Sequence, residues 1–192
     1  MSQEQLFSND TNFSSDNEMP GIRAKIIGVG GAGLSLVDGL RFDNFQSVEH
    51  LAVDVDSRAL ADSIAGEKLF FGRRQTRGMG TGGEFSLARK AMEEEKDVIR
   101  QKLEGFDLVF LLAGLGGGTG GGAAPVIAEI AKEEGILVVA VVTKPFSFEG
   151  PTRVKLAEAG IQDLAKHVDS LITIPNEKLI DVLGEDTSFL NF

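Results

Sequence analysis

The chain has 192 residues, 42% of them hydrophobic, which is enough for one α/β domain with a substantial core. Its formal net charge of −10 disfavours a general nucleic-acid binder, because phosphate backbones require clustered Lys and Arg. The absence of cysteine excludes disulfides and thiolate metal sites. A polar N-terminus and the lack of a long apolar run argue against a signal peptide and a membrane span, so we expect a soluble cytoplasmic protein.

Residues 1–20 are rich in Ser, Asn, Asp and Glu, and we expect them to form a disordered tail. From residue 21 onward, short apolar runs alternate with longer amphipathic segments. That alternation predicts an α/β domain over residues 21–192, with a Rossmann-like parallel sheet and helices on both faces. Strands are expected at 24–29, 48–53, 68–71, 108–113, 137–142 and 171–174, and helices at 34–41, 59–63, 85–103, 124–134, 153–166 and 177–182.

A glycine-rich turn at residues 28–33 (GVGGAG) follows the first expected strand and satisfies the G-x-G-x-x-G spacing. Asp54 and Asp56 follow the second strand, where a dinucleotide-binding domain keeps the acid that accepts the ribose hydroxyls. Together these two features leave an NAD-binding Rossmann oxidoreductase as an open alternative.

Two further glycine-rich segments favour a mononucleotide instead. One is at 78–83 (GMGTGG), and the other is at 113–122 (AGLGGGTGGG) between an apolar strand and an Ala-rich helix. Glycine lets the backbone approach a ligand closely, and the helix that follows adds free N–H groups and the positive end of its dipole. The single diphosphate of a dinucleotide needs one such glycine-rich loop, whereas a mononucleotide triphosphate can use several. No Walker motif occurs, so the phosphates would be held without a P-loop lysine.

Polar residues also follow the fifth and sixth expected strands. Glu149 could accept ribose hydroxyls, and Arg153 could supply one of the few cations that an acidic protein needs beside a polyphosphate. Asn176 is placed either to cap a helix or to contact the ribose or base. His50 and His167 have no Cys, Glu-x-x-His pattern or second His at ligand spacing, so we expect no histidine metal site.

These motifs, in this order, resemble the nucleotide-binding domain of the FtsZ family, the bacterial relatives of tubulin that build the division ring. The resemblance extends from about Ala24 to Phe192 and is carried by GLGGGTGGGAAPVIAEIAKEEGILVVAVVTKPFSFEG and KHVDSLITIPNEKL. It implies a tubulin/FtsZ-type GTPase domain that binds GTP with Mg²⁺, with no catalytic residue or protein metal ligand in this chain. The GTP-binding residues it implies are Gly31, Ala32, Gly33, Leu34, Ser35, Gly117, Gly118, Thr119, Gly120, Glu149, Arg153 and Asn176.

The resemblance also implies a filament-forming cell-division protein. Its subunits would polymerise head to tail at the division septum, hydrolyse GTP at their interfaces, and work with membrane-anchoring and other division proteins. Nucleic-acid binding and direct membrane insertion are not implied. The sequence stops at Phe192, before the family's central helix, acidic loop and second domain. We therefore expect this chain to seat a nucleotide without completing the hydrolytic site, and a non-catalytic, polymer-capping paralogue remains the second alternative.

Four positions depart from the family pattern. Leu34 and Ser35 stand where the family usually has Gly and Asn, and Gly121 replaces the second Thr of GGGTGTG. After the second strand, Asp54 begins a segment that usually reads Asn-Thr-Asp. We expect the lost hydroxyl and the added carboxylate to weaken nucleotide binding or to change its metal dependence.

Overall fold

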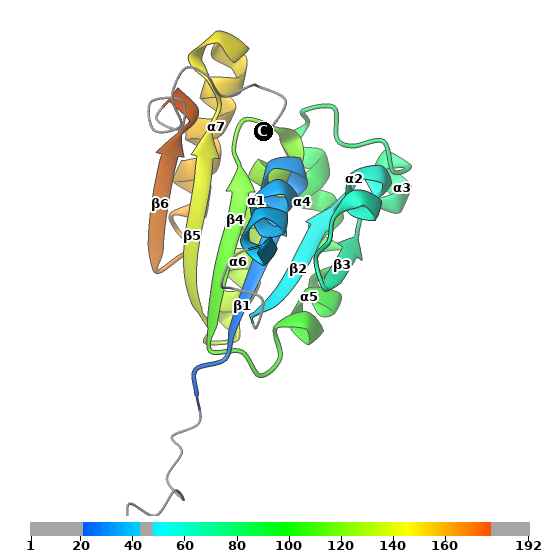
Figure 1. The fold of residues 1–192 in the computed structure, drawn as a ribbon. Coiled ribbons are helices and arrows are strands. Elements are labelled where there is room, and N and C mark those ends of the chain that lie inside the picture. Colours follow the sequence, from blue (N-terminus) through cyan, green and yellow to red (C-terminus); the bar gives the residue numbers. More distant parts are fainter. Residues whose placement is uncertain (1–20, 43–47, 178–192) are drawn as a thin grey trace, which may run out of the picture.

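The computed structural model describes residues 21–42 and 48–177, which form a six-stranded parallel sheet (Figure 1). The strand order is β3-β2-β1-β4-β5-β6. All six strands expected from the sequence are present. The tail expected at 1–20 and nearly all of the helix expected at 177–182 lie outside the described residues. The strands are β1 (Ala24–Val29), β2 (Glu49–Asp54), β3 (Glu67–Phe70), β4 (Leu108–Gly114), β5 (Leu137–Lys144) and β6 (Ser170–Pro175).

Helices cover both faces of this sheet, as expected for a parallel sheet built from βα units (Figure 1). One face carries α1 (Gly30–Phe42) and α2 (Ser57–Asp62), and the other carries most of the core. Within the described part of the chain, no helix has the length and apolarity that crossing a bilayer requires. The remaining helices are α3 (Arg73–Thr76), α4 (Phe85–Glu93), α5 (Lys96–Leu103), α6 (Gly118–Glu133), the 3₁₀ turn η1 (Ser147–Glu149) and α7 (Pro151–Leu164).

Four helices begin earlier than the sequence pattern predicts, α2 and α7 by two residues and α1 and α6 by more. α1 begins at Gly30 rather than residue 34, and α6 begins at Gly118 rather than residue 124. The glycine-rich segments after β1 and β4 are therefore partly the first turns of helices, not loops. The single helix expected at 85–103 is two helices, because Glu95 leaves the helical region of the backbone, at φ −104° and ψ 13°.

Glycines let α1 and α6 pack directly on the strands. A Cβ added at Gly33 of α1 would lie 2.5 Å from the carbonyl oxygen of Leu112 in β4, and one at Gly120 of α6 would lie 2.4 Å from that of Gly114. Backbone atoms at these contacts cannot rotate away as a side chain can. Each position therefore excludes any residue larger than glycine unless the helix moves.

The departure at Gly121 has a packing explanation. A Cβ added there would lie 2.2 Å from the ring of Phe85, the first residue of α4. The same ring lies 3.1 Å from the position of a Cβ on Gly160 in α7. Glycines in α6 and α7 thus make room for the Phe85 ring, which fixes the start of α4 beside the start of α6.

α1 offers a matched test of this packing. Gly33→Ala should lower the free energy of unfolding by about 1–3 kcal/mol, because the added methyl overlaps backbone atoms. Gly39→Ala in the same helix meets no atom within 4 Å and should raise that free energy, by at most about 1 kcal/mol, through helix propensity. Urea unfolding measures both. Equal effects at the two positions would contradict the close contact between Gly33 and β4.

Candidate functional site

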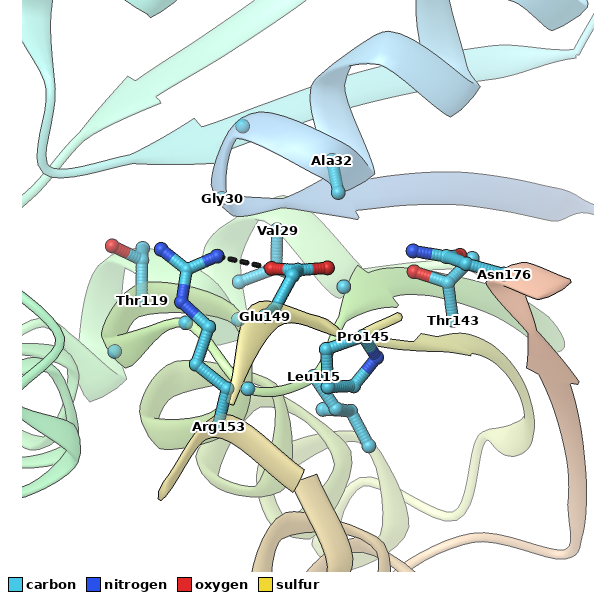
Figure 2. A pocket seen from close by; sticks show the side chains of 16 residues that line it. Val29, Gly30, Ala32, Leu115, Thr119, Thr143, Pro145, Glu149, Arg153 and Asn176 are labelled. Carbon is cyan, nitrogen blue, oxygen red and sulfur yellow. Dashed lines mark hydrogen bonds and ion pairs between the residues drawn. The ribbon is translucent and has the colours of Figure 1, made fainter. Parts of the chain in front are cut away.

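A pocket of about 240 Å³ opens at the carboxyl ends of the central strands. In parallel α/β sheets this edge is where ligands bind, because the loops that leave neighbouring strands diverge there. Figure 2 shows Arg153 and Thr119 at one end of the pocket, Asn176 and Thr143 at the other, and Glu149 between them. The residues that line it are Val29, Gly30, Gly31, Ala32, Gly114, Leu115, Gly116, Gly117, Gly118, Thr119, Gly120, Thr143, Pro145, Glu149, Arg153 and Asn176.

Two helix N-termini meet at this pocket. Gly30 begins α1 at φ +73°, and a Cβ on it would lie 3.1 Å from the amide nitrogen of Gly120 in α6. Gly117, the N-cap of α6, has no side chain with which to cap the helix, so the first-turn N–H groups stay open to water or a ligand. Both helix dipoles present their positive ends here, and this combination suits an anion such as phosphate.

An ion pair forms one wall of the pocket. The Arg153 guanidinium donates to Glu149 Oε2, one turn earlier in the chain (Figure 2). Glu149 Oε1 accepts a hydrogen bond from the backbone N–H of Phe146 at 2.9 Å. The pair is neutral overall. The positive potential of the site in this acidic chain therefore comes mainly from backbone dipoles, with Arg153 able to turn toward an anion that competes with Glu149.

The structure brings most of the implied GTP-binding residues together and leaves three outside. Gly33 packs against β4 rather than the pocket, and Leu34 is 3% exposed in the core beneath α1. Ser35 donates from its hydroxyl to the carbonyl oxygen of Gly31 at 3.1 Å and faces an apolar groove beside β4. Because α1 begins at Gly30, its second turn already points away from the pocket. Those that line the pocket are Gly31, Ala32, Gly117, Gly118, Thr119, Gly120, Glu149, Arg153 and Asn176.

Several lining residues were not singled out from the sequence as nucleotide contacts. Thr143 is the last residue but one of β5, Pro145 follows that strand, and Leu115 and Gly116 lie between β4 and α6. Leu115 and Gly116 belong to the glycine segment at 113–122 that already indicated a phosphate site, and the signal that could have found Thr143 and Pro145 is their position at the carboxyl end of a central strand.

The glycine segment at 78–83 does not line the pocket. Instead it lies behind the pocket wall, where the Thr81 hydroxyl would be 2.2 Å from a Cβ on Gly118. Thr81 is buried, and its segment packs against the first turn of α6. The segment at 78–83, which the sequence suggested as a second phosphate-binding loop, therefore packs against the first turn of α6 in this structure.

Asp54 ends β2 as a buried carboxyl. Its Oδ1 accepts hydrogen bonds from the backbone N–H of Val55 at 2.7 Å and of Asp56 at 3.1 Å. Burial raises the pKa of Asp54, outweighing those hydrogen bonds, which lower it. Among the described residues, no group of three or more His, Asp or Glu side chains could hold a metal ion by itself.

The strand order β3-β2-β1-β4-β5-β6 does not by itself exclude a dinucleotide site, because NAD-binding Rossmann domains share it. The decisive observation is that a family model described as "Tubulin/FtsZ family, GTPase domain" matches residues 23–184. The chain belongs to the tubulin/FtsZ family. This confirms the resemblance read from the motifs, and neither the NAD-binding nor the polymer-capping alternative is favoured.

Individual members of the tubulin/FtsZ family agree with this assignment. Cell division protein FtsZ of Coxiella burnetii is 53% identical over 167 residues, 87% of this chain and 43% of that protein. FtsZ of Pseudomonas aeruginosa is 50% identical over 166 residues, 86% of this chain and 42% of that protein. The chain therefore spans less than half the length of these curated relatives.

Solved structures of the family show the same fold. The FtsZ dimer of M. jannaschii superimposes with a TM-score of 0.84 and 37% identity, covering 91% of this chain and 51% of that one. CetZ2 from Haloferax volcanii, solved as a GTPγS-bound protofilament, gives 0.79 and 26% identity, covering 88% and 53%. The six-stranded sheet is thus the tubulin/FtsZ GTPase domain.

The buried carboxyl at position 54 gives a prediction with a defined pH dependence. A raised pKa in the folded state means that Asp54 opposes folding once the pH exceeds its unfolded pKa. Asp54→Asn keeps an oxygen acceptor for both backbone N–H groups, so it should stabilise the protein near pH 7 and bring progressively less gain toward pH 4. Urea unfolding at both pH values measures the difference.

Asp62→Asn, at the exposed end of α2, serves as the control and should change stability little at either pH. If Asp54→Asn instead destabilised the protein near pH 7, the Asp54 carboxylate would have to be stabilised by a partner such as a cation, contrary to our interpretation.

Proposed function

We propose that this chain binds GTP in the pocket between α1, α6 and η1. The observation that carries the proposal is the meeting of two glycine-rich helix N-termini at the carboxyl ends of β1 and β4, that of α6 having no side-chain cap. Such N-termini bind phosphate through backbone N–H groups and dipoles, which suits a chain with a net charge of −10 and few cations in the pocket. Family membership supports guanine as the base.

The nucleotide is oriented along the pocket in this proposal. Its phosphates occupy the end formed by Gly31, Ala32 and residues 117–120, its ribose approaches Glu149, and Asn176 lies on the guanine side. Arg153 exchanges part of its contact with Glu149 for the phosphates. Mg²⁺ would arrive with the nucleotide and be held mainly by phosphate oxygens, since Mg²⁺ sites at phosphates need only one or two protein ligands. Gly33, Leu34 and Ser35 stay predictions as nucleotide contacts.

We further propose that the protein hydrolyses GTP as part of a head-to-tail polymer in cell division, in the cytoplasm at the septum. The relatives named cell division protein FtsZ support this role, as do the neighbours solved as an FtsZ dimer and a CetZ2 protofilament. Head-to-tail contacts that do not close into a ring give filaments. Membrane-anchoring and other division proteins are the further partners in this proposal.

The phosphate end of the pocket can be tested with glycines of one helix. Gly31 lines the pocket, and a Cβ added there meets no protein atom within 4 Å, so Gly31→Ala should fold normally. The methyl should keep phosphate from the backbone and weaken binding of a fluorescent GDP by about tenfold, which corresponds to about 1.4 kcal/mol. Gly39→Ala, in the same helix but outside the pocket, should bind as the unmodified chain does.

Competition in the same assay identifies the ligand. GTP should displace the fluorescent GDP, whereas ATP and NAD should not. Displacement by NAD in preference to GTP would contradict the proposed function. Unchanged affinity in Gly31→Ala, with GTP still competing, would instead contradict the placement of the phosphates beside α1.

A further inference from the structure

β5 and β6 end side by side, and the chain that follows β5 reaches the opposite end of the pocket from the residue that follows β6. Lys144 at the end of β5 is paired in register with Pro175 at the end of β6. The chain after β5 carries Glu149 and Arg153, and the residue after β6 is Asn176 (Figure 2). A nucleotide that spans the pocket therefore contacts two separate segments, whose relative position must be set by something other than the sheet itself.

One side chain connects the two segments. Glu177, the residue after Asn176, accepts through Oε1 a hydrogen bond of 2.7 Å from the backbone N–H of Ser147, the first residue of η1. The N–H of Phe146, the residue before, donates to Glu149 at 2.9 Å. Two neighbouring amides at the start of η1 are thus bound by two carboxylates, one of which belongs to the β6 side of the pocket.

The Ser147 side chain also hydrogen-bonds Glu177, and the remaining hydrogen bonds and ring contacts found for η1 are local. Among the described residues, Glu149 N donates to the carbonyl oxygen of Phe146 at 3.0 Å, Gly150 N donates to that of Ser147 at 3.5 Å, and the rings of Phe146 and Phe148 stack on each other. Phe148 is 73% exposed, so the stacked pair does not anchor the turn deeply in the core. The hydrogen bond from Ser147 to Glu177 is therefore the contact that ties this turn to the neighbouring strand.

The charge of Glu177 suits this task. Hydrogen bonds from its own backbone N–H and from that of Ser147 lower the pKa of the Glu177 carboxyl, so the group stays ionised at neutral pH. A hydrogen bond to an ionised acceptor is shorter and stronger than one between neutral groups.

We propose that Glu177 is a positioning residue for nucleotide binding. By holding Ser147, it sets the wall formed by Glu149 and Arg153 at a fixed distance from Asn176, so that ribose and base enter a pocket that is already formed. Preorganisation of this kind improves affinity because less ordering is left for the ligand to impose. The proposal rests on the proposed function, since it takes the ligand to be a guanine nucleotide.

The test combines amide exchange and binding. In nucleotide-free protein, Glu177→Ala should speed hydrogen exchange at the Ser147 amide by about tenfold or more, because its partner is lost. The same variant should bind fluorescent GDP about five- to tenfold more weakly. Glu177→Gln keeps an oxygen acceptor and should restore part of both effects, which a general loss of charge would not. Glu158→Gln, an exposed carboxylate on α7, is the control and should change neither.

The outcomes separate the two proposals. If the unmodified chain binds no guanine nucleotide, the proposed function fails, and the positioning role fails with it. If the unmodified chain binds GDP and Glu177→Ala binds it equally well, the positioning role alone is overturned, whatever happens to amide exchange. Unchanged exchange at Ser147 overturns it too, because the hydrogen bond would then contribute nothing to holding the turn.

Discussion

Two helices, α1 and α6, begin so close together that a side chain at the first residue of α1 would press on the backbone of α6. A Cβ on Gly30 would lie 3.1 Å from Gly120 N, and one on Gly120 would lie 2.4 Å from the carbonyl oxygen of Gly114. This approach brings both positive dipole ends to one point at the edge of the sheet. The position of the pocket, its chemistry and its dependence on glycine all follow from that contact.

Backbone dipoles and side-chain packing have different roles in the site. The chain carries a net charge of −10, and the one ion pair identified on the pocket wall, Arg153 with Glu149, is neutral. In the proposed function, attraction for phosphate therefore comes from backbone groups whose positions are fixed by packing. Phe85 does not line the pocket, but its ring lies against Gly121 and Gly160 and holds α4 beside the first turns of α6. Glu177 has the corresponding role at the other end, through η1.

Much of the fold and site could be predicted because the signals are local. Six apolar runs predicted six strands, and the glycine segments after β1 and β4 predicted a phosphate site at their ends. The errors arose where local pattern is silent. Glycine-rich segments look like loops, so the starts of α1 and α6 were placed too late. The break between α4 and α5 was missed because no glycine or proline stands at Glu95 to indicate it. The glycine turn at 28–33 followed by Asp54 also kept an NAD-binding domain as an alternative, which the family match does not favour.

The sequence alone determined the fold class, the family and the edge of the sheet where the pocket opens, because apolar periodicity and glycine spacing are properties of neighbouring residues. Only the tertiary structure decided which glycines face the pocket and which pack, as Gly31 and Gly33 of one helix illustrate. It also decided that Glu177 reaches Ser147, 30 residues away in the chain. Such contacts depend on where each helix begins and on which strands end side by side, and those are set by the packing of the whole domain.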